Sequence, residues 1–199
     1  LSMGINESNL GLIPFASQMG YAAAILLISP LGDVMRRKTL IALLSISLTL
    51  SLLGIYFSST LWMLILATFF VGISANITQQ IIPFAASLSS PENKGKVIST
   101  IMTGLTLGIL LSRTVSGSIA EAFDWRMVYL FAAIFSVVIG ILLFIVLPNP
   151  QSNAKMSYPS LIASMFSLIK NQPLLREAAI TGALWFAAFN ALWATLAIH

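Results

Sequence analysis

The 199-residue sequence contains no cysteine, a single histidine and few charged residues. The absence of cysteine excludes disulfides, thiolate nucleophiles and cysteine-based metal sites. The one histidine is the last residue and cannot form a histidine metal cluster by itself. Charged residues make up 8% of the chain, compared with about 25% in soluble domains. Such a chain cannot cover a surface that faces water, and we interpret it as an integral membrane protein.

The sequence also lacks the usual arrangements of catalytic residues. Its apolar segments contain no nucleophile–base pair, no cluster of metal ligands and no phosphate-binding loop. We therefore expect neither an enzyme nor a protein that holds a metal or a cofactor. The net charge of +4 does not indicate nucleic-acid binding, because the basic residues lie in short loops between apolar runs. The expected partner is instead a lipid bilayer.

Long apolar runs dominate what is present. Hydrophobic residues make up 58% of the chain, and the mean hydropathy is +0.95. A helix needs about 20 apolar residues to cross the hydrocarbon core of a bilayer. The sequence therefore predicts an all-α, polytopic transmembrane protein with six spans: Leu10–Gly32, Thr39–Phe57, Leu61–Leu88, Val97–Ala120, Met127–Leu147 and Ala178–Ile198.

The second predicted span is rich in hydroxyl side chains. Ser45, Ser47, Thr49 and Ser51 follow one another at alternate positions. In a helix, such hydroxyls can donate to the backbone carbonyl one turn earlier, which makes them inexpensive in lipid. We therefore expect this span to cross the membrane despite its polarity.

Basic residues are distributed very unevenly between the two sides of the predicted spans. Only Arg126 lies on one side. The other side carries eight, which follow the first, third and fifth spans: Arg36, Arg37, Lys38, Lys94, Lys96, Lys155, Lys170 and Arg176. Because cytoplasmic loops carry the excess of lysine and arginine, the side with eight is predicted to be cytoplasmic. The long connection on this side, residues 148–173, is expected to contain an amphipathic surface helix over Ser160–Lys170, with a disordered linker as the alternative.

The loop after the first span resembles the signature loop of the major facilitator superfamily, which reads roughly G-x-L-A-D-R-x-G-R-R-K. Here the corresponding residues are Ser29-Pro30-Leu31-Gly32-Asp33-Val34-Met35-Arg36-Arg37-Lys38. Asp33 and the basic tail match, whereas Ser29, Val34 and Arg36 depart from the motif. The sequence of this loop is similar to that of bacterial drug and sugar efflux members of the family. This resemblance implies a multi-pass protein of the bacterial inner (plasma) membrane. The residues expected to form a conformational signature are Gly32, Asp33, Arg36, Arg37 and Lys38.

Two further segments carry the resemblance. Residues 72–83 and the loop at 91–96 resemble the fourth helix of the family and its loop, although Thr68 stands where an arginine is common. The fourth predicted span resembles the antiporter motif G-x-x-x-G-P-x-x-G-G of the fifth helix, with Arg113 at the proline position and serines replacing two glycines. The residues of this motif are Gly104, Gly108, Ser112, Arg113, Ser116 and Gly117.

The position of these motifs implies a register. In the family, the acidic and basic loop follows helix two and the long cytoplasmic loop follows helix six, whereas here they follow spans one and five. The six spans then correspond to helices two to seven of twelve. Residues 1–147 would form an N-terminal half without its first helix, 148–173 a cytoplasmic linker, and 174–199 the first helix of a truncated C-terminal half. We expect an incomplete major facilitator fold: a fragment, a split gene product or the product of a decayed gene.

The resemblance implies secondary active transport of a small molecule. Two halves would rock around a site near the membrane midplane in alternating access, exporting the substrate in exchange for protons. Asp33, at the end of a span, is the only acid offered for such coupling. Helix-terminal carbonyls would repel it, which predicts a cationic partner, and Arg37 at i+4 is the nearest. The alternative is a non-transporting membrane protein, either a gene remnant or an interaction module.

Several polar side chains within the spans are candidates for the substrate path. Arg113 lies far from a span end, where it either lines a cavity or snorkels to outer headgroups. The small residues beside it repeat every four positions and form a smooth face for a neighbouring helix. Trp62, Trp125 and Tyr129 are interpreted as interfacial anchors, not as ligands. The remaining candidates either line the path or bond between helices: Gln18, Tyr21, Asn76, Gln79, Gln80 and Asn190.

Overall fold

The computed structural model describes residues 11–149 and 157–196, with side chains as far as residue 192. The chain divides into two compact units, residues 1–154 and 155–199, and each is described by itself. Helices of the first unit are α1 (Leu12–Leu27), α2 (Leu31–Val34), α3 (Arg37–Tyr56), α4 (Leu61–Ser74), α5 (Ile77–Ser87), α6 (Lys94–Ala122) and α7 (Trp125–Val146).

Five stretches of these helices are long and apolar enough to cross a membrane. α1 with α2 makes the first, and α4 with α5 makes the third; the others are α3, α6 and α7. The second unit contains α8 (Tyr158–Asn171), which includes the predicted amphipathic helix, and α9 (Pro173–Leu196), which includes the sixth predicted span as far as Leu196. Among the described residues α9 is not one of the five candidate spans, compared with six predicted. The described residues are helical with short connections, so the predicted all-α class is confirmed.

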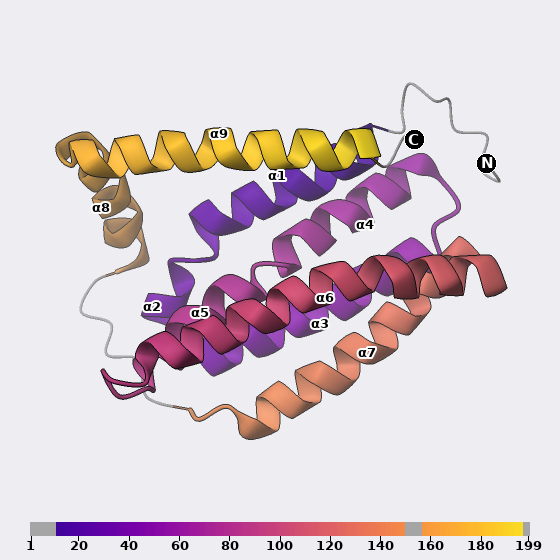
Figure 1. The fold of residues 1–199 in the computed structure, drawn as a ribbon, viewed down its shortest axis with the longest axis horizontal. Coiled ribbons are helices and arrows are strands. Elements are labelled where there is room, and N and C mark those ends of the chain that lie inside the picture. The colour runs from indigo at the N-terminus through magenta and orange to yellow at the C-terminus, as the bar shows by residue number, and fades with distance from the viewer. Residues whose placement is uncertain (1–10, 150–156, 197–199) are drawn as a thin grey trace. The chain divides into compact units, whose positions relative to one another are not determined.

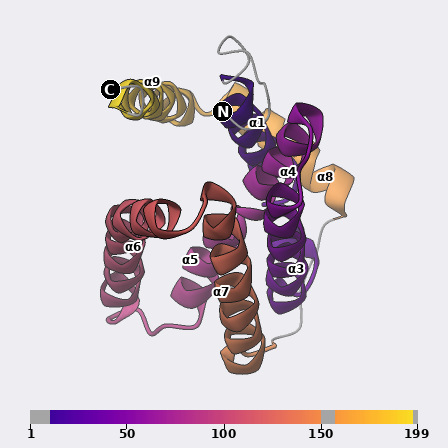
Figure 2. The same ribbon diagram turned by 90° about the vertical axis from the view of Figure 1, so that its right-hand side faces the viewer.

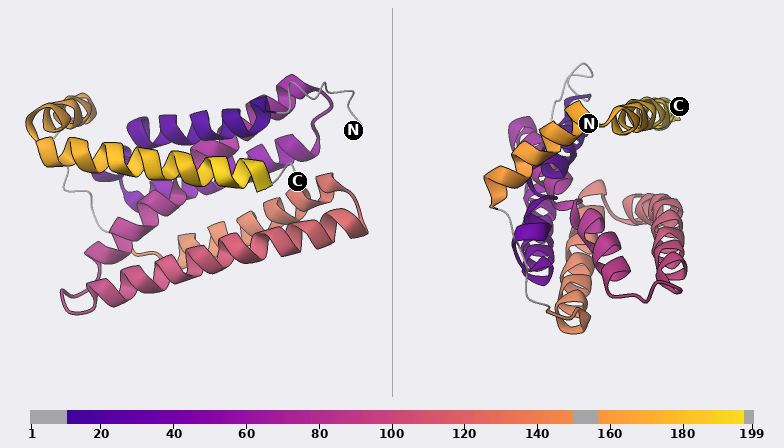
Figure 3. Two further views of the ribbon diagram at one scale, coloured as in Figure 1. Left: turned by 45° about the horizontal axis from the view of Figure 1, so that its top comes forward. Right: turned by 90° about the vertical axis from the view of Figure 1, so that its left-hand side faces the viewer.

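The helices of the first unit form a row with a hairpin at one side. α1 packs against α4, α4 against α3, and α3 against α7 (Figures 1 and 2). α6 follows α5 and is joined to α7 by a short turn, so that α6 and α7 form the arms of a hairpin (Figure 3). The core is built mainly by α3, with contributions from α1, α4 and α5, whereas α6 buries none of its residues in the part of the chain described.

α1 and α4 approach each other backbone to backbone. A Cβ atom on Gly20 of α1 would overlap the carbonyl oxygen of Phe69, and one on Gly72 of α4 would overlap the carbonyl oxygen of Ser17. Both glycines are buried. In lipid, small residues allow this close approach, and the packing between backbones provides the stability that apolar side chains alone do not. The two glycines therefore fix where α1 and α4 cross.

The hydroxyl groups of α3 bond as expected. Ser45 donates to the carbonyl of Ile41 at 2.9 Å, Thr49 to the carbonyl of Ser45 at 3.0 Å, and Ser51 to the carbonyl of Ser47 at 2.7 Å. Because each bond stays within the helix, the polar side chains need no water. Despite its serines, this segment is long and apolar enough to cross a membrane, as predicted.

Hydroxyls of α3 also connect it to both neighbours. The side chain of Ser74 on α4 donates to the Ser47 hydroxyl at 2.8 Å. On the other side, the Thr49 hydroxyl is hydrogen-bonded to that of Ser136 on α7 at 3.2 Å. α3 is thus held in the centre of the row by polar contacts as well as by packing.

The first and third spans differ from prediction because each is interrupted. α1 ends at Leu27 and α2 begins at Leu31, while α4 ends at Ser74 and α5 begins at Ile77. Pro30 explains the first interruption, since proline has no amide hydrogen and disfavours the helical conformation of the residue before it. At the second interruption lies Asn76, whose side chain is engaged in contacts with the first interruption. Pro83, in contrast, is accommodated inside α5.

Candidate functional site

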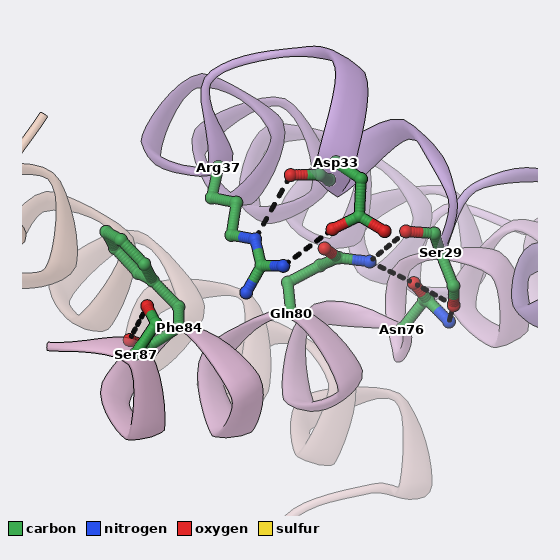
Figure 4. A network of polar contacts seen from close by, with 8 residues as sticks. Ser29, Asp33, Arg37, Asn76, Gln80, Phe84 and Ser87 are labelled. Carbon is green, nitrogen blue, oxygen red and sulfur yellow. Dashed lines mark hydrogen bonds and ion pairs between the residues drawn. The ribbon is translucent and has the colours of Figure 1, made fainter. Parts of the chain in front are cut away.

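The two interruptions lie against each other and are joined by side-chain amides (Figure 4). Asn76 donates to the Ser29 hydroxyl at 3.0 Å. Gln80, one turn further along α5, donates to the Asn76 side-chain oxygen at 3.1 Å and reaches the Ser29 carbonyl at 3.4 Å. This cluster of Ser29, Asn76 and Gln80, which we call the amide bridge, connects the first span to the third.

The amide bridge is buried and its hydrogen bonds are satisfied. Asn76 is 0% exposed and Gln80 is 2% exposed. Buried amides are costly unless they find partners, and among the described residues no buried side-chain nitrogen or oxygen lacks one. In this arrangement Asn76 and Gln80 form hydrogen bonds that connect the third span to the first.

The signature loop rests on this bridge. Gly32 is buried, and a Cβ atom on it would overlap the side-chain oxygen of Gln80. A larger residue would have to displace the Gln80 amide, so glycine at this position lets α2 lie directly on α5. The position of the loop thus depends on contacts with the third span.

Asp33 and Arg37 close the loop. The Arg37 guanidinium donates to the Asp33 carboxylate at 2.7 Å and, through Nε, to the Gly32 carbonyl at 3.0 Å. The predicted partner of Asp33 is therefore confirmed. The Asp33 side chain is 58% exposed and that of Arg37 24%, and exposed pairs contribute at most about 1 kcal/mol to stability. The pair sets the shape of the loop more than it stabilises the fold.

The other basic residues of the signature lie around the start of α3. Arg36 occupies the position before the first helical residue. The Lys38 ammonium lies 4.7 Å from the centre of the Phe144 ring on α7, a cation–π contact. The loop is thereby connected to α7 as well as to α5.

The adjacent loop between α5 and α6 carries an acid of its own. Hydrogen bonds from the backbone N–H of Glu92 and from the Ser90 side chain lower the pKa of the Glu92 carboxyl below its ordinary value. Glu92 lies at the surface and remains ionised at neutral pH. It offers a matched acid for comparison with Asp33.

The remaining predicted path residues are distributed over both units. Gln79 donates to the Tyr21 hydroxyl at 2.8 Å, which joins α5 to α1 at an exposed position, and Gln18 is exposed on α1. Asn190 belongs to the second unit and donates to the Phe186 carbonyl of its own helix at 2.8 Å. Of these residues, Tyr21 and Gln79 are thus hydrogen-bonded to each other.

The motif on α6 is accessible in the described structure. A Cβ atom on Gly104, Gly108 or Gly117 would meet nothing within 4 Å. The Ser112 and Ser116 hydroxyls donate to carbonyls of their own helix, at 2.9 and 3.1 Å. The predicted smooth face is thus present.

Sequence reasoning missed one arrangement. Trp125 and Tyr129, interpreted as interfacial anchors, line a cleft together with Arg113. Arg113 is followed by cleft residues at i+3, i+4 and i+7 on α6, and Trp125 and Tyr129 are four apart on α7. The shared helical spacing on either side of a short turn was the signal that could have placed them on facing surfaces.

Apolar helices interrupted beside an acid–arginine loop define a multi-pass α-helical membrane protein. The chain belongs to the major facilitator superfamily, whose sequence profile matches residues 1–199. It is 38% identical over 196 residues to the uncharacterized transporter YgaY of Escherichia coli O157:H7, an alignment that covers 98% of this chain and 50% of that protein.

Two other relatives also have names that describe transport. The protein named Probable transporter SCO4007 from Streptomyces coelicolor is 28% identical over 98% of this chain and 46% of its own length. The multi-drug resistance efflux pump PmrA of Streptococcus pneumoniae (strain TIGR4) is 26% identical over 68% of this chain and 37% of its own length. The chain spans about half the length of the first two relatives. No solved structure gives a significant match.

Proposed function

We propose that this chain is part of a secondary active transporter that exports small molecules by alternating access, in exchange for protons, in the bacterial inner membrane. Family membership and relatives named as transporters support transport. The relative named as a multi-drug resistance efflux pump supports export. The proposal assigns residues 1–147 to one half of the transporter, 148–173 to a cytoplasmic linker and 174–199 to the other half.

The observation that carries this proposal is the signature loop held on the amide bridge. Arg37 donates hydrogen bonds to the Asp33 carboxylate and to the Gly32 carbonyl. The Gln80 side chain packs directly against Gly32 and so holds the loop in position. A buried hydrogen-bond network holds this exposed acid in a fixed position. The acid is therefore suited to contact the second half of the transporter as that half moves. We infer that Asp33 acts in conformational switching and not in folding.

A chimera tests this function. In the chimera, residues 1–199 replace the segment of YgaY to which they align. The chimera is expressed in bacteria that lack their main efflux pumps. We expect lower accumulation of at least one dye from a panel of anionic, neutral and cationic fluorescent dyes, and loss of this effect when a protonophore collapses the proton gradient. Export that persists without the gradient would contradict proton coupling, and a stably inserted chimera that exports none of a panel of dyes and drugs would contradict the transport proposal.

A further inference from the structure

A cleft of about 410 Å³ lies between α6 and α7, close to the turn that joins them. Sites for small molecules commonly measure about 300–1,000 Å³, so the cleft is large enough for a one- or two-ring compound. Its walls are formed chiefly by Arg113, Ser116, Gly117 and Ala120 on α6, and by Trp125 and Tyr129 on α7.

Arg113 gives this cleft a positive charge. It lies nine residues before Ala122, the end of α6, which is about 14 Å along the helix. Every other charged residue in the helices of the first unit lies within about one turn of a span end. Among the described residues that line the cleft there is no carboxylate. Ionisable residues at such depth within a span commonly mark a functional site.

The aromatic wall of the cleft is fastened from outside. The Trp125 and Tyr129 rings meet edge to face, with centroids 6.0 Å apart. The Arg126 guanidinium lies 4.6 Å from the centre of the Trp125 ring and donates to the Ser58 carbonyl, just beyond α3, at 3.0 Å. The ring is thus held in a fixed place beside Arg113, as a preformed surface for an apolar body.

The opposite wall is open at its centre. A Cβ atom on Gly117 would meet nothing within 4 Å, and Ala120 adds only a methyl group one turn further. The space between the helices is therefore not filled by side chains at this level. A flat molecule can lie between α6 and the aromatic wall with its polar end toward Arg113.

We propose that this cleft binds an organic anion with an apolar or aromatic body, with its carboxylate on Arg113 and its body beside Trp125 and Tyr129. The planar guanidinium can form two parallel hydrogen bonds to one carboxylate, which strengthens and orients the contact. An organic cation would meet like charge and no acid. That the bound anion is also the transported substrate rests on the proposed function.

Binding to the full chain in phosphatidylcholine nanodiscs tests the cleft directly. The probe is radiolabelled 1-naphthoate, measured by equilibrium dialysis, with 1-naphthylmethylammonium as the cation of matched shape. We expect the anion to bind and the cation not to bind. Arg113→Gln should weaken naphthoate binding about tenfold or more, because a charge-assisted contact is lost, and Arg113→Lys should weaken it less.

Two further variants separate the site from the fold. Lys96→Gln removes the same charge from the same helix outside the cleft and should leave binding unchanged. Gly117→Leu places a side chain in the cleft at a position where a Cβ atom meets nothing within 4 Å, and it should reduce binding while the charge remains. Equal binding of anion and cation, or naphthoate binding unaffected by both Arg113→Gln and Gly117→Leu, would overturn the proposal.

Varying the lipid composition tests whether the anion site is used by a lipid headgroup or by a free anion. If phosphatidylglycerol in the nanodiscs displaces naphthoate from the unmodified chain, the anion site is used by a lipid headgroup; if it does not, the site takes a free anion. Transport is tested separately with the YgaY chimera. A chimera that exports dye while the chain fails to bind naphthoate would contradict only the cleft, and naphthoate binding with no export of any compound would contradict only the proposed function.

Discussion

Asp33 is the residue whose role is most sharply separated from stability. Its carboxylate is 58% exposed and bound to Arg37, so Asp33→Asn should change the free energy of unfolding by no more than about 1 kcal/mol. In the YgaY chimera we expect the same substitution to abolish most dye export while membrane expression is retained. Both are measured in the same cells, by dye accumulation and by immunoblot.

Glu92→Gln is the control for this prediction, since it removes an acid from the adjacent loop. It should leave export close to that of the parent chimera. If Asp33→Asn lowers expression and export equally, the residue serves the fold and the switching role is wrong.

Gln80 and its neighbour Gln79 allow a comparison of two amides at adjacent positions. Gln80→Leu removes the shorter of the two hydrogen bonds to the buried Asn76 side-chain oxygen, the other coming from the Ser29 hydroxyl, and we expect a loss of about 1–2 kcal/mol in stability. Gln79→Leu removes an exposed contact with Tyr21 and should cost less than about 0.5 kcal/mol. Titration with sodium dodecyl sulfate, followed by far-ultraviolet circular dichroism, measures both; equal midpoints would show that the bridge contributes nothing.

At the scale of elements, the glycines of α1 and α4 should tolerate no side chain. Gly20→Ala places a methyl group on the Phe69 carbonyl oxygen, and Gly72→Ala places one on that of Ser17. We expect each to destabilise the chain by about 1–3 kcal/mol, as overpacking does. Gly104→Ala on α6 meets nothing and should be neutral or slightly stabilising, because alanine favours helix. Thermal unfolding in detergent compares the three, and a tolerated Gly20→Ala would mean that α1 and α4 cross elsewhere.

The length of apolar runs and the position of charges predicted the helices well, because both follow from the thickness of the bilayer and the cost of charge within it. α3, α6 and α7 begin and end within a few residues of the predicted spans. The ion pair of Asp33 and Arg37 was also predictable, since the two residues are only four apart in the sequence.

Contacts between distant segments could not be predicted in the same way. The spacing of Asn76, Gln79 and Gln80 shows that they share a face, but not that Ser29, 47 residues before Asn76, supplies the partner. The interruption of the third span was hidden for the same reason, since the Asn76 amide at this interruption donates to Ser29 of the first span. The position of Trp125 in the wall of the cleft likewise depends on how α6 and α7 are rotated about their own axes.

For the whole molecule, the uneven distribution of basic residues predicts orientation. Reporter fusions after Lys38 and after Asn93 should report the cytoplasm, and a fusion after Ser59 should report the opposite side. Alkaline phosphatase and green fluorescent protein, which are active on opposite sides, provide the measurement. Fusions after Lys38 and Ser59 that report the same side would contradict the assignment of spans.

Residues 1–199 expressed alone should not transport. The substrate site in such proteins forms between two halves, and the first unit provides five candidate spans. In bacteria without their main efflux pumps, we expect dye accumulation equal to that of the empty vector, while the YgaY chimera lowers it. The amount of each protein in the membrane fraction is the control. Restored export that Arg113→Ala abolishes would mean that the chain assembles a pathway by itself, for example as an oligomer.

The crossing of α1 and α4 also determines how such a molecule can move. Where two backbones touch, no layer of side chains lies between them that could exchange one set of rotamers for another, so the pair behaves as a single rigid strut. Both interruptions belong to this strut, and the amide bridge joins them. A force on the signature loop would therefore turn α1 and α4 together instead of sliding one along the other. In the proposed transport cycle, the movement for opening and closing must come from helices that are packed more loosely. Among the described residues, those of α6 are all unburied, so α6 is the helix with the most freedom to move.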